Sequence, residues 1–261
     1  MPTVEEVYHQ AWGKVGGVGR LRRTFSLFVF MRQMLELQVK NKNPGISGAE
    51  LTWRTAKRMY FSSATTRQLL DRVGITSMAT DDFPETIERI LPILNELGVR
   101  FHLTGGIAAS YYGDPRFTQD LDVVIDLVND RPETSLLLNR LSSGYFIDLP
   151  AAIDAIEHRS LFQAIDERSM VKIDFHVGEK ISGELDRATR REVVPGIMAP
   201  LVSKEDAILS KLLWIQQGSG KSRHDVIEML KRDEDLDRGC LRDRAATLGL
   251  SELLAEFENE I

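Results

Sequence analysis

Residues 99–127, VRFHLTGGIAASYYGDPRFTQDLDVVIDL, decide the fold of this chain. The stretch opens with β-forming residues whose apolar side chains alternate, which predicts a strand over residues 99–103. Gly105 and Gly106 follow. Because glycine has no Cβ, they let the backbone turn sharply and let a ligand approach it closely. A short helix predicted over residues 107–112 then presents its first N–H groups, which suit phosphate oxygens.

Two aspartates, Asp120 and Asp122, begin a second predicted strand that continues through Ile125. Residues two apart in a strand project from the same face, with Cα atoms about 6.5 Å apart. Carboxylates at this spacing can bridge one or two Mg²⁺ ions, which hold a polyphosphate and an attacking oxygen in line. The pattern therefore predicts a metal and phosphate site. The alternative is an ordinary glycine turn followed by aspartates at a solvated strand end.

Two glycines, a spacer and an Asp-hydrophobic-Asp strand resemble the signature of the polymerase-β-like nucleotidyltransferases. The fuller string is most similar to the AbiEii-type nucleotidyltransferases, many of which are toxins of toxin–antitoxin pairs: Leu103-Thr104-Gly105-Gly106, Arg116, Thr118, Asp120 and Asp122. The resemblance implies an α/β (α+β) fold, in which a mixed sheet is flanked by helices. It also implies an NTP substrate, Mg²⁺ or Mn²⁺ as the metal, and nucleotide binding by Gly105, Gly106, Arg116 and Thr118.

A third carboxylate lies in a predicted hairpin with strands over residues 160–165 and 170–177. In the second strand apolar side chains alternate with Lys172, Asp174 and His176. Asp174 matches the place where the superfamily keeps its third carboxylate, on the strand beside Asp120 and Asp122. The resemblance implies that Asp174 helps to hold the metal and acts as the base toward an acceptor hydroxyl. The alternative is a surface aspartate on a strand.

Two later positions match helical motifs of the family. Lys211 lies in a helix predicted to run from Ser203 to Gln217, where the family carries a lysine that offsets triphosphate charge and favours pyrophosphate departure. Asp225 matches the last motif, although His224 replaces the lysine that usually precedes it. The resemblance assigns Lys211 to catalysis and assigns Lys211 and Asp225 to nucleotide binding. The alternative for Lys211 is a solvated side chain.

The composition is that of a globular protein. Of 261 residues, 43% are hydrophobic and 28% are charged. No apolar run approaches the ~20 residues that cross a bilayer, and the first ten residues are acidic where a signal peptide would be basic and then apolar. Cys240 is the one cysteine, which excludes an intrachain disulfide and a cysteine-based metal cluster. These features predict a cytoplasmic protein without membrane association.

The charge is distributed unevenly along the chain. Residues 1–80 contain 12 Lys and Arg against 5 Asp and Glu, whereas the remainder contains 21 against 34. We therefore predict a basic helical region at 1–80, a nucleotidyltransferase core at 81–200 and a helical C-terminal lobe at 201–261. The basic region is expected to attract an RNA acceptor. The alternatives are that it binds a protein partner or simply covers the core.

Two classes of function follow from these observations. The first is an enzyme that moves a nucleotide monophosphate from an NTP to a hydroxyl of an RNA such as tRNA, or of a protein. Such an enzyme can be the toxin of a pair, which implies an antitoxin protein as a partner. The alternative is a non-catalytic nucleotide sensor, or an antitoxin-partner module, on the same fold.

Overall fold

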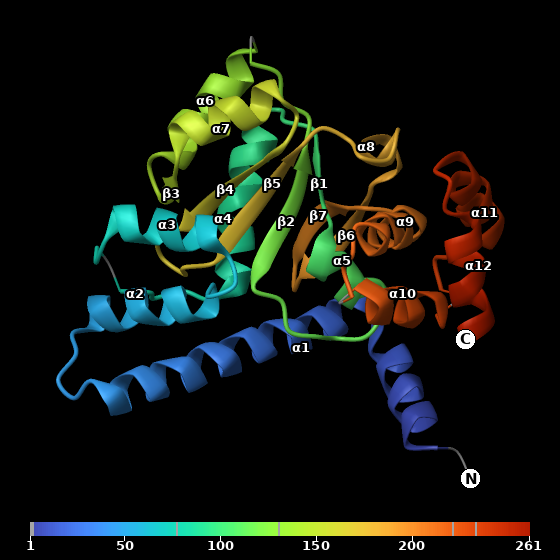
Figure 1. The fold of residues 1–261 in the computed structure, drawn as a ribbon, viewed down its shortest axis with the longest axis horizontal. Coiled ribbons are helices and arrows are strands. Elements are labelled where there is room, and N and C mark those ends of the chain that lie inside the picture. Colours follow the sequence, from blue (N-terminus) through green and yellow to red (C-terminus); the bar gives the residue numbers. More distant parts are fainter. Residues whose placement is uncertain (1–2, 77, 130, 221, 233) are drawn as a thin grey trace. The chain divides into compact units, whose positions relative to one another are not determined.

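The computed structural model describes residues 3–76, 78–129, 131–220, 222–232 and 234–261 (Figure 1). In this described part the chain forms twelve helices and seven strands, which confirms the predicted mixed α/β class. The chain divides into two compact units. The first consists of Met1–Thr24, His102–Arg116 and Glu179–Ile261, and the second of Phe25–Phe101 and Phe117–Gly178. The three-part division by charge stays a prediction.

The N-terminal region is helical, as predicted. It contains α1 (Val4–Lys42), α2 (Gly48–Met59) and α3 (Ala64–Val73). Gly16 interrupts α1 with φ 72° and ψ 171°, a conformation that glycine adopts without steric cost. Ser47 caps α2, because its hydroxyl accepts a hydrogen bond from the Glu50 N–H at 3.2 Å.

Four strands of the second unit form its sheet in the order β3 (Tyr145–Ile147), β4 (Leu161–Asp166), β5 (Lys172–Val177) and β2 (Asp120–Ile125). The β4–β5 hairpin is antiparallel and β5 pairs with β2 in parallel, in a register that sets Asp122 opposite Asp174. One face of these strands forms the core. Its side chains are fully buried: Leu121, Val123, Ile173 and Phe175.

The remaining helices of the second unit are α4 (Phe83–Glu96), α6 (Pro132–Leu141) and α7 (Leu149–Glu157). Pro92 lies inside α4, and the helix continues through it to Glu96. A capping box between Asp82 and Glu85 fixes its start.

The last two residues of β1 (Phe101–Leu103) belong to the first unit, where β1 runs parallel to β7 (Ile197–Leu201), with Leu103 opposite Leu201. The strand β6 (Thr189–Val194) joins β7 in a hairpin whose turn contains Gly196 at φ +80°. The helix α5 (Gly105–Tyr112) follows β1, and the short helix α8 (Glu184–Arg187) precedes the hairpin. Four helices follow the hairpin: α9 (Lys204–Gln216), α10 (Ser222–Leu230), α11 (Arg238–Thr247) and α12 (Ser251–Glu260). No helix in the described residues is both long enough and apolar enough to cross a membrane.

Candidate active site

The carboxylates of the second unit meet on one face of its sheet. The parallel register sets Asp120 opposite Lys172 and Asp122 opposite Asp174. Because side chains alternate along a strand, these four side chains share the face opposite the apolar core. The structure therefore brings the three predicted carboxylates together on two adjacent strands, and it adds a lysine to the group. We call Asp120, Asp122, Asp174 and Lys172 the carboxylate cluster.

Lys172 holds two of the three carboxylates. Its Nζ lies 3.1 Å from Asp120 Oδ2 and 2.5 Å from Asp174 Oδ2. The lysine side chain is 8% exposed. Burial lowers the pKa of Lys172, but the charges of Asp120 and Asp174 outweigh this effect, so that its pKa is raised. Lys172 is therefore a charged counter-ion of the carboxylate cluster at neutral pH.

Asp174 is the most buried of the three carboxylates. Burial raises the pKa of Asp174 to about 6. Lys172 opposes this rise, and the negative charges of Asp122 and Asp120 add to it. A carboxyl group that titrates near neutral pH is suited to accept a proton from a hydroxyl. Asp122 has a different neighbour, because His176 Nε2 lies 3.3 Å from its Oδ1.

Tyr60, the C-cap residue of α2, ties together the strands that carry the cluster. Its hydroxyl accepts the Lys172 N–H at 2.9 Å and lies 2.9 Å from the Met170 carbonyl and 3.0 Å from the Gln119 carbonyl. Lys172 is the first residue of β5, Met170 lies two residues before it, and Gln119 directly precedes β2. Sequence reasoning missed Tyr60, since nothing local to residue 60 indicates contacts more than 100 residues away.

Thr118 also contacts the cluster. Its hydroxyl lies 3.3 Å from the Asp120 carbonyl and 3.4 Å from Asp120 Oδ1. The side chain is buried, and these contacts orient the first carboxylate of β2. Its predicted role in nucleotide binding stays a prediction.

The donor set of the cluster fits a divalent cation such as Mg²⁺, which prefers carboxylate oxygens. Among the described residues Asp174 Oδ1 is buried without a hydrogen-bond partner, and Lys172 already shows that a cation is bound between Asp120 and Asp174. No set of three or more His, Cys, Asp or Glu side chains in the described chain is arranged to hold a metal. Lys172 contacts one oxygen of Asp120 and one of Asp174, and a metal on these carboxylates would use the same oxygens.

The glycine turn lies in the first unit, between β1 and α5. The helix begins at Gly105, two residues earlier than predicted, after Thr104 in an extended conformation. Gly105 has φ +59°, in the left-handed region that a residue with a Cβ adopts at a cost. Gly106 is buried in the first turn. The sharp turn that the two glycines predicted is therefore present.

Three further predicted residues of the first unit form one cluster, which we call the Asp225 cluster. Arg116 donates to both oxygens of Asp225, from Nε at 2.6 Å and from Nη2 at 2.9 Å. Lys211 Nζ lies 3.0 Å from Asp225 Oδ2. Burial raises the pKa of Asp225, but Lys211 and Arg116 outweigh this, so that its pKa is lowered. Asp225 therefore fixes two cations and stays ionised, whereas His224 beside it is exposed.

Lys204, two turns before Lys211 on α9, is buried and binds backbone carbonyls. Its side chain is 2% exposed, and its Nζ donates to the Arg232 carbonyl and, at 2.8 Å, to the Glu234 carbonyl. It therefore fixes the start of α9 against the turn after α10.

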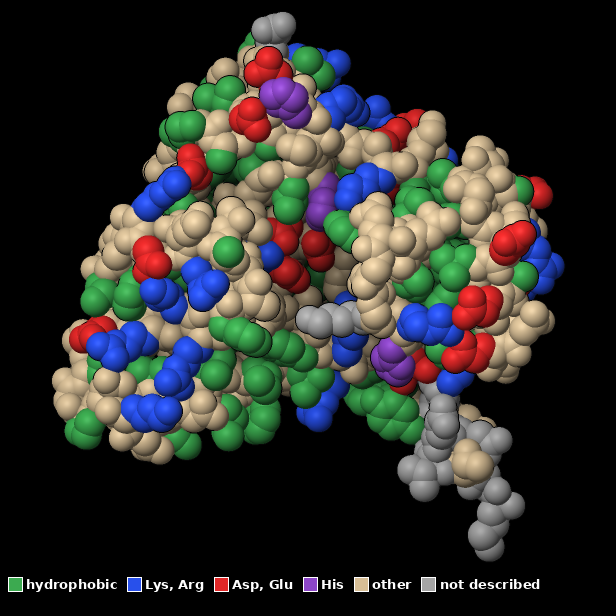
Figure 2. Space-filling view, viewed as in Figure 1, with side chains coloured by type: hydrophobic (Ala, Val, Ile, Leu, Met, Phe, Trp, Pro, Cys, Tyr) green, Lys and Arg blue, Asp and Glu red, His purple; other side chains and the backbone are tan. Residues whose placement is uncertain are grey.

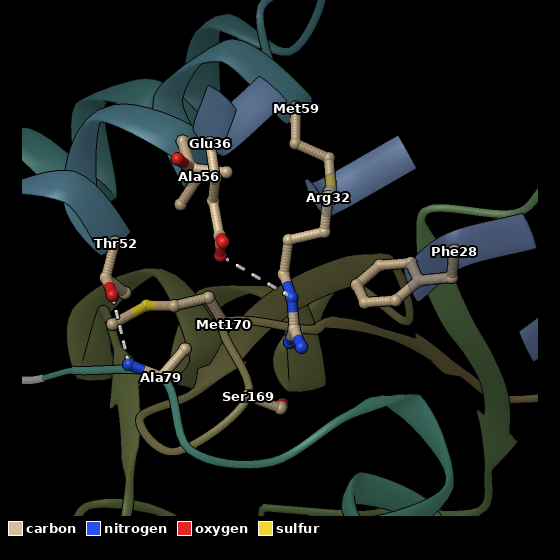
Figure 3. Close-up of a pocket in the computed structure, with 10 residues that line it drawn as sticks. Phe28, Arg32, Glu36, Thr52, Ala56, Met59, Ala79, Ser169 and Met170 are labelled. Atoms are coloured by element: carbon tan, nitrogen blue, oxygen red, sulfur yellow. Dashed lines mark hydrogen bonds and ion pairs between the residues drawn. The ribbon is translucent and has the colours of Figure 1, made fainter. Parts of the chain in front are cut away.

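A small cavity in the second unit has no room for a ligand (Figure 3). Its volume is about 10 Å³, which suits roughly one water molecule. The guanidinium of Arg32 lies in it, donates to the Asp81 carbonyl at 2.8 Å and pairs with Asp82 and Glu36. These contacts fasten α1 to the start of α4.

A family model covers most of the sheet and the helices that follow it. The chain matches the family model described as "Nucleotidyl transferase AbiEii toxin, Type IV TA system" over residues 89–254, well over half of its length. No curated protein sequence matches the chain at a significant level.

Solved structures similar to the chain include an antigenic nucleotidyltransferase-like protein from Paracoccidioides brasiliensis, with 21% identity and a TM-score of 0.43 over 69% of this chain and 94% of that one. The solution structure of the antibiotic-resistance factor ANT(2'')-Ia has 15% identity and a TM-score of 0.43, over 67% and 95%. The lincomycin-bound lincosamide antibiotic adenylyltransferase LnuA has 18% identity and a TM-score of 0.39, over 56% and 96%.

Proposed function

The chain belongs to the AbiEii family of nucleotidyltransferase toxins, and we propose that it transfers a nucleotide monophosphate from an NTP to an acceptor hydroxyl in an Mg²⁺-dependent reaction. The observation that carries this proposal is the carboxylate cluster, in which Asp120, Asp122 and Asp174 share one face of β2 and β5. These three residues would hold the metal. When bound, Mg²⁺ or Mn²⁺ supplies charge neutralisation and alignment of phosphate oxygens.

Asp174 serves as the base in this proposal. The acceptor hydroxyl oxygen forms a bond to the α-phosphorus, the bond from that phosphorus to the pyrophosphate oxygen breaks, and the hydroxyl proton passes to Asp174. The pKa of Asp174, raised to about 6, supports this role, because the group is ionised at pH 7 and still basic enough to accept a proton.

Nucleotide binding falls to Gly105, Gly106, Arg116, Thr118, Lys211 and Asp225 in the proposal. The glycines offer backbone N–H groups at the start of α5 to phosphate oxygens. Lys211 and Arg116 supply positive charge that offsets the charge of the departing pyrophosphate. Asp225 contributes by positioning both cations, because it accepts hydrogen bonds from Arg116 and Lys211.

The acceptor side of the proposal rests on the surface around Asp174. Gln163 on β4 lies opposite Asp174. The Thr66 hydroxyl on α3 donates to Gln163 Oε1 at 3.0 Å. Gln163 also lines a groove of about 180 Å³, together with Gln68, Arg72 and Asp148, the ion-pair partner of Arg72. Lys and Arg side chains gather over α2 and α3 beside this groove (Figure 2), which supports an RNA acceptor such as tRNA over a protein hydroxyl.

Salt bridges reduce the charge that this basic surface offers. Arg54 pairs with Glu50 at 2.6 Å, and Lys57 pairs with Asp71 at 2.5 Å and lies 4.6 Å from the Trp53 ring centroid. Arg58 makes a 3.5 Å contact with Gln38. The part of α1 beside them is apolar at its surface, with Phe30, Met34 and Leu37 exposed. A protein partner such as an antitoxin is therefore the rival occupant of this region.

Labelling tests the proposed function. The protein is incubated with each labelled NTP, Mg²⁺ and total cellular RNA or protein, and the labelled fraction identifies the acceptor. The matched control is the Asp120→Asn, Asp122→Asn double variant, which keeps the side-chain size and removes both charges. NTP binding without transfer of label to either fraction would favour the non-catalytic sensor. A toxin role in the cytoplasm predicts that expression of the parent, and not of the double variant, stops growth.

A further inference from the structure

The ammonium of Lys172 lies where the carboxylate cluster would bind a cation. Its Nζ contacts Asp120 Oδ2 and Asp174 Oδ2, one oxygen from each of two strands. The side chain is 8% exposed, so that this ammonium is shielded from water that would replace the carboxylates. The Lys172 backbone is also fixed, because its N–H donates to Tyr60 Oη at 2.9 Å. A lysine held at both ends is a built feature of the site.

The charges of the cluster match one divalent ion. Three carboxylates and one ammonium leave two negative charges, which one divalent cation neutralises. A second divalent ion on Asp120 Oδ2 and Asp174 Oδ2 would share their lone pairs with the ammonium and be repelled by it at close range. Metal-assisted nucleotidyl transfer is often organised by two ions a few ångströms apart, so the lysine affects how many ions the free protein holds.

Resting on the proposed metal site, we propose that Lys172 is a built-in cation that replaces one of the two divalent ions in the nucleotide-free protein. The free protein then binds a single ion per chain, with Asp122 and the oxygens that Lys172 does not contact. This role makes Lys172 a positioning residue, because it sets the charge and spacing of Asp120 and Asp174 without touching the substrate.

Titration with Mn²⁺ in the absence of nucleotide, followed by electron paramagnetic resonance of the free ion, tests this role. Lys172→Met keeps the length of the side chain and removes its charge, and Lys172→Arg keeps the charge. Lys40→Met removes an exposed lysine of the same unit. We expect one Mn²⁺ per chain for the parent, K172R and K40M. K172M is expected to bind a second ion, or to bind the first about tenfold more tightly.

Thermal unfolding gives a second measurement, which can be made even if K172M folds poorly without a bound metal. Without a metal, K172M leaves three carboxylates without their counter-ion, so Mn²⁺ should raise its melting temperature more than that of the parent. If K172M is unfolded in chelator, recovery of the fold on addition of Mn²⁺ supports the proposal, and failure to recover overturns it.

The outcomes separate this inference from the proposed function. Two Mn²⁺ ions per chain in the parent, or equal stoichiometry and affinity in the parent and K172M, would overturn the role of Lys172 and leave the metal site intact. Absence of Mn²⁺ binding in both proteins, with nucleotide as well as without it, would overturn both the role of Lys172 and the proposed metal site.

Discussion

At the level of single residues, the carboxylates of β2 and β5 differ in how far their side chains are buried. The Asp120 side chain is 31% exposed, whereas that of Asp174 is 10% exposed. Asp174 loses more hydration, and its pKa rises to about 6, while water and Lys172 surround the more open Asp120. The same residue type on the same face of the sheet is therefore suited to two tasks. Asp120 is suited to metal binding, and Asp174 is suited to proton transfer as well.

We predict that Asp174→Asn lowers kcat by about 10²–10⁴-fold, because the amide cannot accept the proton. In the parent, the base is ionised above its pKa, so kcat/KM should fall as the pH decreases below that pKa, which burial raises and a bound Mg²⁺ ion would lower. The pH profile of the residual activity of D174N should lack this acidic limb. The check is a pH series at saturating Mg²⁺ for both proteins, and an unchanged limb in D174N would remove Asp174 from the role of base.

Lys204 gives a prediction on stability, since burial lowers its pKa to about 8. Below pH 8 both the folded and unfolded chains carry the proton, and the cost of burying the charge is fully present. Between pH 8 and about 10.5 the unfolded chain binds more protons than the folded chain, so the free energy of unfolding rises with pH. The rise from this group is about 3 kcal/mol at most. Lys204→Met should lack it.

Urea unfolding of the parent and K204M at pH 7.5 and pH 10 measures this difference. Other groups titrate over the same interval in both proteins, so the comparison isolates Lys204. Equal pH dependence in the two proteins would show that Lys204 keeps an ordinary pKa in the folded chain.

At the level of secondary-structure elements, the C-terminal end of α2 holds the beginnings of β2 and β5, the two strands that carry the carboxylate cluster. Tyr60 follows α2 directly, and its hydroxyl contacts the backbone at the beginning of β5 and just before β2. Gln119 adds a second tie, because its Nε2 donates to the Met59 carbonyl at 2.6 Å. The end of α2 therefore sets the register at which the two strands of the carboxylate cluster enter the sheet.

We predict that Tyr60→Phe costs about 1–3 kcal/mol of stability, because it leaves the buried Lys172 N–H without its acceptor. Amide hydrogen exchange at Lys172 should accelerate, and kcat should fall as the spacing of Asp120 and Asp174 relaxes. The matched control is Tyr112→Phe, which removes a buried hydroxyl that donates to the Val202 carbonyl at 2.8 Å in the first unit. A similar loss of stability without faster exchange at Lys172 is expected for Y112F. The same exchange pattern in both variants would contradict the strand-fixing role.

At the level of the whole molecule, the uneven charge decides what the protein can attract. An acidic catalytic chain repels RNA phosphates, and the basic helices α2 and α3 provide an opposite field (Figure 2). Most of their charges take part in salt bridges, so the surface attracts polyanions through its net excess of positive charge and not through unpaired side chains.

We predict that reversing Arg54, Lys57 and Arg58 to glutamate weakens RNA binding about tenfold or more and flattens its salt dependence. NTP binding should survive. The matched control reverses Arg100, Arg131 and Arg140, three more exposed side chains of the same unit, and so changes the net charge equally. The measurement is the affinity for total cellular RNA at several salt concentrations. Equal effects of the two triple variants, or unchanged labelling of the acceptor, would favour a protein partner for α1–α3.

Local chemistry in the sequence determined most helices, the two hairpin strands β4 and β5, the strand of Asp120 and Asp122, and the glycine turn. Caps and hydrophobic periods are properties of neighbouring residues, so they can be read without a fold. The strands β3, β6 and β7 were missed, since they are short or rich in charged residues and become strands through pairing. The family of the chain followed from the same local motif and was confirmed by the family match.

Tertiary structure alone decided the partners of these residues. The parallel pairing of β2 with β5 puts Lys172 between Asp120 and Asp174, and the sequence assigned no role to that lysine. Tyr60 reaches Lys172 across 112 residues. Asp225 holds Arg116 across 109 residues. The physical reason is that a residue's pKa, its counter-ion and its hydrogen-bond partner depend on burial and distance in space, and neither follows from the order of residues along a chain.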